Sequence, residues 1–225
     1  MQRFFDIIFS IFAIVLFLPL LLPLMLILRF TGEGEIFFLQ NRVGRANKIF
    51  KLYKFATMLK DSPNIGSGTV TLKNDPRILP LGGFLRKTKI NELPQLINIL
   101  IGDMSIIGPR PQTQRCFNAF SLSSQHEIIK VRPGLSGIGS IIFRNEEDMM
   151  DANNDPDRFY DEVVMTYKGT LEKWYVTNQN IMTYFGLILA TIWSVLRPNS
   201  SFIWLLFNNL PKPPDELKNA LNYND

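Results

Sequence analysis

Apolar residues form one long run at the start of the chain. Residues 4–28 contain only two polar side chains, Asp6 and Ser10, both near the beginning. A membrane helix needs about 20 apolar residues, and no small-residue cleavage site of a signal peptide follows this run. Pro19 and Pro23 each remove a backbone donor from the middle of the run, so a straight helix is not expected.

Charged residues flank this run on both sides and bear on its topology. Arg3 and Asp6 lie at one end and Arg29 at the other, so both ends favour a charged interface. The preferred prediction is a re-entrant helix that bends at residues 18–19 and returns to the side from which it entered. The alternative is a kinked helix that crosses the bilayer. In both topologies the positive charges keep the chain from Arg29 onward in the cytoplasm.

Behind the apolar run, alternating and turn-rich segments predict a pair of strands followed by a loop and a turn. Residues 35–40 predict a strand, and residues 48–53 predict its partner across a turn at residues 41–47. Residues 61–73 are rich in Gly, Ser, Thr and Asn and are expected to form a mobile loop. Residues 74–77 read Asn-Asp-Pro-Arg, which is typical of a turn.

The spacing of apolar residues predicts a helix over residues 91–101, with Asn91 as an acceptable N-cap. Its predicted apolar face consists of four residues three or four positions apart: Leu93, Leu96, Ile97 and Leu100. Residues 132–139, RPGLSGIG, form a glycine-rich loop. Backbone N–H groups of such a loop are a weak candidate for cradling a phosphate.

The C-terminal third is predicted to be helical. Residues 159–176 indicate one helix. Residues 181–196 are apolar but interrupted, so they predict either a core helix or an interfacial helix that uses Tyr184 and Trp193. Residues 202–207 are a second interfacial candidate.

Charge is distributed unevenly along a chain whose net charge is +4. Residues 29–60 carry seven basic residues against two glutamates, and residues 146–162 carry eight acidic residues against one arginine. The basic block directly follows the apolar run and is expected to lie at anionic headgroups. No nucleic acid partner is expected, because no basic stretch is interleaved with exposed aromatic residues.

Cysteine and histidine are too scarce to build a catalytic or zinc centre. Cys116 and His126 are the only residues of their kinds, which fits a reducing compartment and excludes an internal disulfide. A bound metal would therefore need oxygen ligands, which favours Mg²⁺ or Mn²⁺.

Residues 87–111 bring several groups of phosphate chemistry together. Glu92, which follows the carboxamide of Asn91, and Asp103 offer carboxylate ligands for a hard cation, and Arg110 stands between two prolines. The planar guanidinium suits phosphate oxygens, and flanking prolines restrict its backbone. Together with the apolar run, this segment predicts phosphate chemistry at a bilayer surface.

Five segments in order resemble the bacterial sugar transferases, the monotopic polyprenyl-phosphate phosphoglycosyltransferases. They are the apolar run with its prolines, FFLQNRVG at 37–44, YKFATM at 53–58, residues 74–111, and VRPGLSGIGSIIFRN at 131–145. The resemblance implies a membrane-associated α/β fold with three parts: a re-entrant membrane helix over residues 1–30, a cytoplasmic catalytic domain with interfacial amphipathic helices over residues 31–210, and a flexible tail over residues 211–225.

The resemblance also implies an activity. Family members transfer a sugar 1-phosphate from a UDP-sugar to undecaprenyl phosphate, with Mg²⁺, at the cytoplasmic face of the bacterial inner membrane. This is the first membrane step of O-antigen, capsule, exopolysaccharide or glycoprotein glycan assembly. A homodimer is a further expectation, and the sequence does not specify the sugar.

Site residues follow from the resemblance position by position. The family's catalytic dyad falls on Asn91 and Glu92, with Glu92 binding the metal and Asp103 as a second candidate ligand. Arg110 would hold the donor phosphate. Four more residues are expected to line the substrate site: Lys54, Arg42, Asp75 and Arg77.

Two residues depart from the family pattern. Ala56 replaces a common arginine, and Asn91 replaces the aspartate that attacks the β-phosphate of the donor. An amide oxygen is a far weaker nucleophile than a carboxylate. Three hypotheses stay open: direct attack by the lipid phosphate with Asn91 as a positioning donor, a different nucleophile at Asp75 or Asp103, or lost catalysis. The last would make the protein a membrane-bound lipid-phosphate-binding or recruiting protein. A plain anchored interaction domain leaves the order of the motifs unexplained.

Overall fold

The computed structural model describes residues 1–65, 75–144, 146, 156–197 and 200–223. The chain forms two compact units within a mixed α/β fold. Unit 1 comprises Met1–Arg3, Arg42–Phe50 and Asp103–Asp225, and unit 2 comprises Phe4–Asn41 and Lys51–Gly102. Much of the predicted loop at 61–73 and of the acidic block at 146–162 lies outside the described residues.

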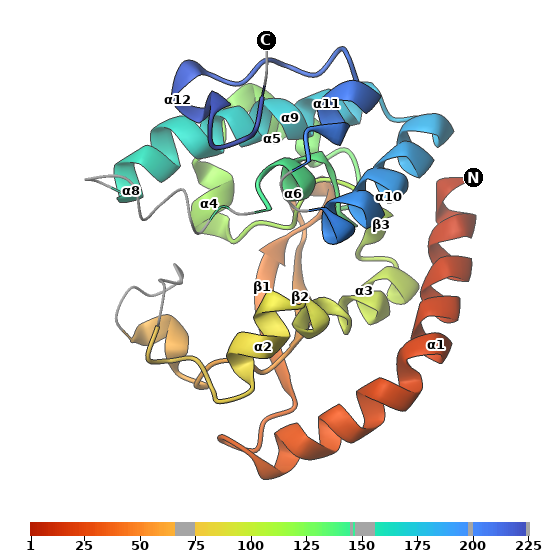
Figure 1. Cartoon of the computed structure of the whole chain (residues 1–225), viewed down its shortest axis with the longest axis vertical. Helices are drawn as coiled ribbons and strands as arrows, with labels where there is room; N and C mark the ends of the chain where they lie inside the picture. Colours follow the sequence, from red (N-terminus) through yellow and green to blue (C-terminus); the bar gives the residue numbers. More distant parts are fainter. Residues whose placement is uncertain (66–74, 145, 147–155, 198–199, 224–225) are drawn as a thin grey trace. The chain divides into compact units, whose positions relative to one another are not determined.

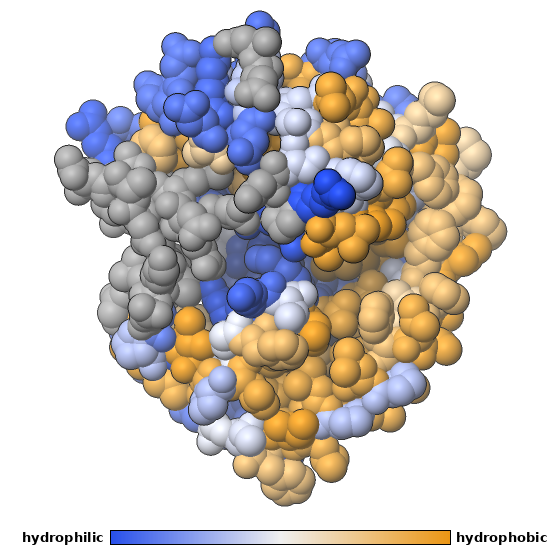
Figure 2. Space-filling view, viewed as in Figure 1, coloured by the Kyte–Doolittle hydropathy of each residue, from blue (hydrophilic) through white to orange (hydrophobic). Residues whose placement is uncertain are grey.

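The apolar run forms a single 29-residue helix, α1 (Gln2–Phe30), with Pro19 and Pro23 inside it. The helix changes direction partway along its length (Figure 1), as expected where prolines remove backbone donors. It is long and apolar enough to cross a membrane and is largely exposed. Hydrophobic side chains cover the region where α1 lies (Figure 2). Asp6, Ser10 and Leu28 are its buried residues.

The predicted hairpin is present, with strands that are longer than expected. β1 (Phe37–Val43) pairs with β2 (Ile49–Phe55) across the 3-10 turn η1 (Arg45–Asn47). The core of unit 2 gathers Leu28, Phe55 and Leu85, with partly buried apolar residues packed around them. Two short helices complete this part of the unit, η2 (Ser62–Asn64) and α2 (Gly82–Lys87).

The predicted helix over 91–101 is divided into two pieces, which corrects two details. A 3-10 turn, η3 (Ile90–Glu92), precedes α3 (Gln95–Ile101), and the N-cap of α3 is Pro94 rather than Asn91. Ile97, expected on the apolar face, is exposed. The buried face instead includes Asn98, whose amide accepts the N–H of Tyr53 at 3.0 Å and donates to the carbonyl of Lys51 at 2.8 Å. Asn98 thus extends the hydrogen-bond pattern of β2, a role that the spacing of apolar residues does not predict.

Unit 1 is built around a parallel pair of short strands. β3 (Ser105–Ile107) pairs with β4 (Gly134–Ser136), with Ser105 opposite Gly134. Between them lie α4 (Gln114–Asn118) and α5 (Leu122–Ile128). After β4 come α6 (Ile138–Ile142), α8 (Pro156–Phe159), the π-helical turn η4 (Tyr160–Val164) and α9 (Met165–Thr177). The predicted helix over 159–176 is therefore confirmed, and α9 packs against α5 and α6 (Figure 1).

The helix predicted over residues 181–196 is present as α10 (Ile181–Leu196), and one of its faces belongs to the core. Its inner face buries five residues: Thr183, Tyr184, Leu187, Ala190 and Ser194. Tyr184 therefore belongs to the core and not to a headgroup layer. The outer face stays apolar and exposed through Met182, Phe185, Leu189, Ile192, Trp193 and Leu196. Such a face is typical of a helix lying on a membrane.

The end of the chain differs from the expected flexible tail. After α11 (Phe202–Leu206) the chain forms a short helix, α12 (Asp215–Lys218). Leu217 and Leu221 are buried, and the carbonyl of Leu221 accepts a hydrogen bond from Trp204 Nε1 at 3.3 Å. Apolar residues in a polar, proline-rich segment hold it against unit 1.

A fluorophore on the outer face of α10 is expected to contact lipid. Cys116→Ser combined with Leu189→Cys allows a single label there, and Thr166→Cys provides a matched exposed position on α9. In vesicles containing brominated lipids, we expect strong quenching of the label at 189 and little at 166. Equal quenching at the two positions would contradict membrane contact by α10.

Candidate active site

Lys54 and Glu92, two of the predicted site residues, form an ion pair within unit 2. Lys54 lies on β2 and Glu92 ends η3, and Lys54 Nζ is 3.4 Å from Glu92 Oε1. The two side chains are 18% and 12% exposed, so the pair is shielded from water but not sealed. A charge-assisted hydrogen bond is usually about 2.7–2.9 Å long. Lys54 therefore offsets the charge of Glu92 without binding it tightly.

Asn91 lies beside this pair in sequence and is almost fully buried, at 6% exposure. Within the part of the chain that the structure describes, its Oδ1 has no hydrogen-bond partner. A buried polar atom left unsatisfied costs about 1–3 kcal/mol, so it calls for a specific explanation. A donor or cation supplied by a ligand would satisfy it.

The residues of this turn fit a magnesium ion that is held mainly by substrate. Among the described residues, no three His, Cys, Asp or Glu side chains gather as a metal site. Magnesium commonly uses one or two carboxylates together with substrate phosphates. Glu92 and the unsatisfied amide oxygen of Asn91 are both oxygen donors of η3 and suit that type of site.

Asp75 and Arg77 form a buried ion pair that joins two segments of unit 2. Arg77 donates from Nε to Asp75 Oδ1 at 2.8 Å and from Nη2 to Oδ2 at 2.5 Å, and both side chains are 3% exposed. Its Nη1 donates to the carbonyls of Ser62 and Ile65, each at 2.8 Å. The hydrogen bond to Asp75 raises the pKa of Arg77, against the opposing effect of burial. These contacts join the turn at residues 75–77 to the loop after β2, and the place of the pair in the substrate site stays a prediction.

In unit 1, the tripeptide Pro109-Arg110-Pro111 is held at three points. The carbonyl of Pro109 accepts the N–H of Gly134 at 2.8 Å, and the carbonyl of Pro111 accepts Arg42 Nη1 at 3.0 Å. The N–H of Arg110 donates to Glu172 Oε1 at 3.1 Å. Both prolines are buried, whereas Arg110 is half-exposed. Arg110 is thus the member of the motif that reaches solvent, and Arg42 supports it.

Glycines explain how the strands below this tripeptide approach each other. A Cβ on Gly134 would lie 2.1 Å from the backbone nitrogen of Gly108, and one on Gly137 would lie 2.1 Å from the Gly108 carbonyl oxygen. No side chain fits at such distances. The glycine-rich segment predicted as a phosphate loop therefore forms β4 and the start of α6, where its glycines permit close packing.

The predicted site residues are divided between the two units. Unit 2 contains five of them: Lys54, Asp75, Arg77, Asn91 and Glu92. Unit 1 contains the other three: Arg42, Asp103 and Arg110. Asp103 is half-exposed and follows Gly102, whose positive φ of 101° ends α3.

Two buried charged residues on α9 were not anticipated from sequence. Glu172 is 1% exposed and Lys168 is also 1% exposed. Lys168 Nζ donates to both carboxylate oxygens of Glu146 at 2.8 Å and lies 5.2 Å from the centre of the Phe143 ring. Their spacing in the sequence could have indicated their burial. Lys168 is four residues from Val164 and three from Leu171, and Glu172 is three residues from Tyr175, so both fall on the apolar face of the helix.

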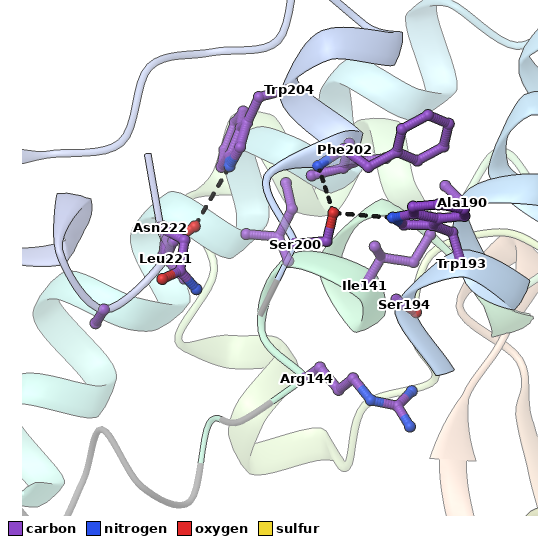
Figure 3. Close-up of a pocket in the computed structure, with 13 residues that line it drawn as sticks. Ile141, Arg144, Ala190, Trp193, Ser194, Ser200, Phe202, Trp204, Leu221 and Asn222 are labelled. Atoms are coloured by element: carbon purple, nitrogen blue, oxygen red, sulfur yellow. Dashed lines mark hydrogen bonds between the residues drawn. The ribbon is translucent and has the colours of Figure 1, made fainter. Parts of the chain in front are cut away.

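Unit 1 also contains a small cavity whose lining includes none of the predicted site residues (Figure 3). It lies among α6, α10, α11 and Leu221, with a volume of about 30 Å³. Ser200 Oγ accepts hydrogen bonds there from Trp193 Nε1 and from the N–H of Phe202. The volume suits about one or two water molecules, so it holds neither a nucleotide sugar nor a lipid.

Comparisons with known proteins identify relatives over most of the chain. A sequence model of the family described as bacterial sugar transferase matches residues 1–198. The chain is 38% identical over 143 residues to UDP-N-acetylgalactosamine-undecaprenyl-phosphate N-acetylgalactosaminephosphotransferase of Aeromonas hydrophila, covering 63% of this chain and 34% of that protein. It is 31% identical over 216 residues to undecaprenyl-phosphate galactose phosphotransferase of Salmonella typhimurium, covering 90% and 42%.

A shorter relative matches along nearly its whole length. The exopolysaccharide production protein ExoY of Sinorhizobium fredii is 33% identical over 215 residues, covering 89% of this chain and 88% of that protein. The chain thus spans less than half of the Aeromonas and Salmonella proteins and most of ExoY.

The buried carboxyl of Glu172 is expected to make stability depend on pH. Burial raises its pKa from 4.5 to about 7, against the opposing effects of the Arg110 N–H and the charges of Lys168 and Arg110. The folded state therefore retains a proton that the unfolded chain loses, and stability falls as pH rises through this window. The shift corresponds to about 3 kcal/mol.

Glu172→Gln removes this titration, so its melting temperature relative to the wild type should rise between pH 5 and pH 8. Glu162→Gln, an exposed control that is 61% accessible, should show a constant difference. A constant difference for Glu172→Gln as well would contradict the raised pKa.

Proposed function

The chain belongs to the bacterial sugar transferase family, and we propose that it transfers a sugar 1-phosphate from a UDP-sugar to undecaprenyl phosphate. The observation that carries this proposal is the similarity over 90% of the chain to a protein named undecaprenyl-phosphate galactose phosphotransferase. The exopolysaccharide relative supports a role in surface glycan assembly. The transferred sugar stays undefined.

The location proposed for the enzyme is the cytoplasmic face of the bacterial inner membrane. The bend of α1 (Figure 1) and the basic residues at both of its ends support a re-entrant, monotopic anchor. The apolar outer face of α10 supports further contact with the bilayer. The region from residue 31 to residue 210 would then supply the catalytic groups.

Charged side chains would offset the negative charge of the substrates. Arg110 would bind phosphate oxygens of the donor in a bidentate manner. Lys54 keeps the charge of Glu92 balanced until substrate arrives. Within unit 2, Glu92 and Asn91 would hold Mg²⁺, which supplies charge neutralisation at the phosphates when bound.

The route proposed for this chain is direct attack by the lipid phosphate. One of its oxygens forms a bond to the β-phosphorus of the donor while the bond from that phosphorus to the bridging oxygen breaks, and UMP leaves with the electron pair. Asp75 is a poor alternative nucleophile because Arg77 occupies both of its oxygens in a buried pair. Asn91 would act as a positioning donor. The substitution of the dyad aspartate by Asn91 also supports a second candidate function, binding of lipid phosphate without turnover.

A UMP-release assay tests the enzymatic proposal. With protein in lipid nanodiscs and a panel of UDP-sugars, we expect UMP only when both Mg²⁺ and undecaprenyl phosphate are present. Glu92→Gln should lower kcat/KM by about 100-fold, because it removes a charged group from the phosphate site. Glu127→Gln, which alters a pair with Lys130, should leave it unchanged. Binding of undecaprenyl phosphate with no UMP from any sugar would favour the non-catalytic candidate.

Labelling of the protein distinguishes direct attack from a covalent intermediate. A donor radiolabelled in the β-phosphate, incubated without lipid acceptor, should leave no label on the wild-type protein. Asn91→Asp restores the family's aspartate and is expected to acquire label, which makes it the positive control. Label on Asp103 of the wild type would show that direct attack is wrong.

A further inference from the structure

The backbone of the Pro109-Arg110-Pro111 tripeptide has a single hydrogen-bond donor. Proline has no backbone N–H, so the N–H of Arg110 is the only one in the three residues. The two neighbouring carbonyls are already bound, by Gly134 and by Arg42. The acceptor of this N–H therefore determines whether the tripeptide is fixed at its centre.

That acceptor is a side chain 62 residues further along the chain, Glu172 on α9. A carboxyl group offers an oxygen that accepts this N–H whether the group is ionised or protonated. Its second oxygen, Oε2, is buried and has no hydrogen-bond partner among the described residues. Burying a carboxyl group with one oxygen unsatisfied is costly, so packing alone does not account for a glutamate here.

The residues around Glu172 allow its carboxyl group to reach the N–H of Arg110. A Cβ on Gly139 would lie 2.4 Å from Oε1, so only glycine lets the carboxylate reach the tripeptide past α6. Lys168, one turn earlier on α9, donates to Glu146 instead. Arg110 and Lys168 supply the positive charges that act on the carboxyl group.

We propose that Glu172 is the positioning residue for Arg110, fixing the tripeptide so that the guanidinium meets the diphosphate of the nucleotide sugar. This inference rests on the proposed function and deepens it. Glu172 is fully buried and touches no substrate. It acts through the backbone of Arg110, while the side chain of Arg110 remains half-exposed for its ligand.

A double-mutant cycle tests the proposal with UMP release. Glu172→Met removes the acceptor at similar volume and should lower kcat/KM for the UDP-sugar about tenfold or more, mainly through KM. Glu172→Gln keeps an acceptor oxygen and should recover most of the activity. Arg110→Ala should be more damaging, and Glu172→Met should add little to it, because the two residues act as one unit.

Leu171→Ala is the matched control, since Leu171 is fully buried on the same helix. It should lower the melting temperature and leave KM unchanged. In the double mutant with Arg110→Ala, the effects of the two substitutions on the free energy of activation should add. If Glu172→Met also combines independently with Arg110→Ala, or if folded Glu172→Gln is as defective as Glu172→Met, the positioning role is wrong.

The same variants separate this proposal from the proposed function. The Kd of UDP is measured by calorimetry on the membrane-reconstituted protein, independently of turnover. If the wild type binds UDP but releases no UMP, the transferase proposal fails, while the Kd values still test the role of Glu172. A Kd about tenfold weaker in Glu172→Met supports the positioning role, and an unchanged Kd overturns it. If the wild type neither binds UDP nor releases UMP, both proposals fall.

Discussion

A charge that leaves water must be compensated inside the protein, and this constraint governs both units. In unit 2, Asp75 and Arg77 are each 3% exposed and bond each other through two contacts. In unit 1, the buried Lys168 donates to both oxygens of Glu146. Removing one partner of such a pair costs about 3–5 kcal/mol, because the other charge stays buried. The contacts of these four residues therefore stabilise the fold.

The incompletely satisfied groups adjoin the two motifs proposed to act on phosphate. Asn91 Oδ1 lies on the turn that carries Glu92, and Glu172 Oε2 belongs to the carboxylate beneath Arg110. Not every such atom has a functional neighbour, since Ser10 Oγ in α1 is also buried without a partner among the described residues. Glu172 differs from Ser10 because its other oxygen makes a hydrogen bond to a predicted site motif. Glu172 holds a motif with one oxygen and leaves the other unsatisfied, which is a cost that packing would not require.

Local patterns predicted the elements of the fold better than the roles of single residues. The hairpin, the helix over 159–176 and α10 follow from periodicity and turn chemistry, which act over a few residues. Roles that depend on distant contacts were harder to predict. Asn98 was assigned no role although it extends β2, and the buried pair that Asp75 forms with Arg77 was not predicted. Glu172 was missed because its acceptor role depends on a motif 62 residues away.

The amide at position 91 changes the charge that two phosphorylated substrates would meet. Direct attack requires the donor diphosphate and the lipid phosphate to be bound together, whereas a covalent scheme admits the lipid after UMP has left. A carboxylate at position 91 would add a negative charge to that assembly. Two like charges 4 Å apart repel by about 4 kcal/mol at an effective dielectric constant of 20. The amide avoids this repulsion, and Lys54 offsets the neighbouring Glu92. In the proposed direct-attack route, the residue that replaces the family's nucleophile would also ease the joint binding of both substrates, which is why its presence favours a ternary complex over lost activity.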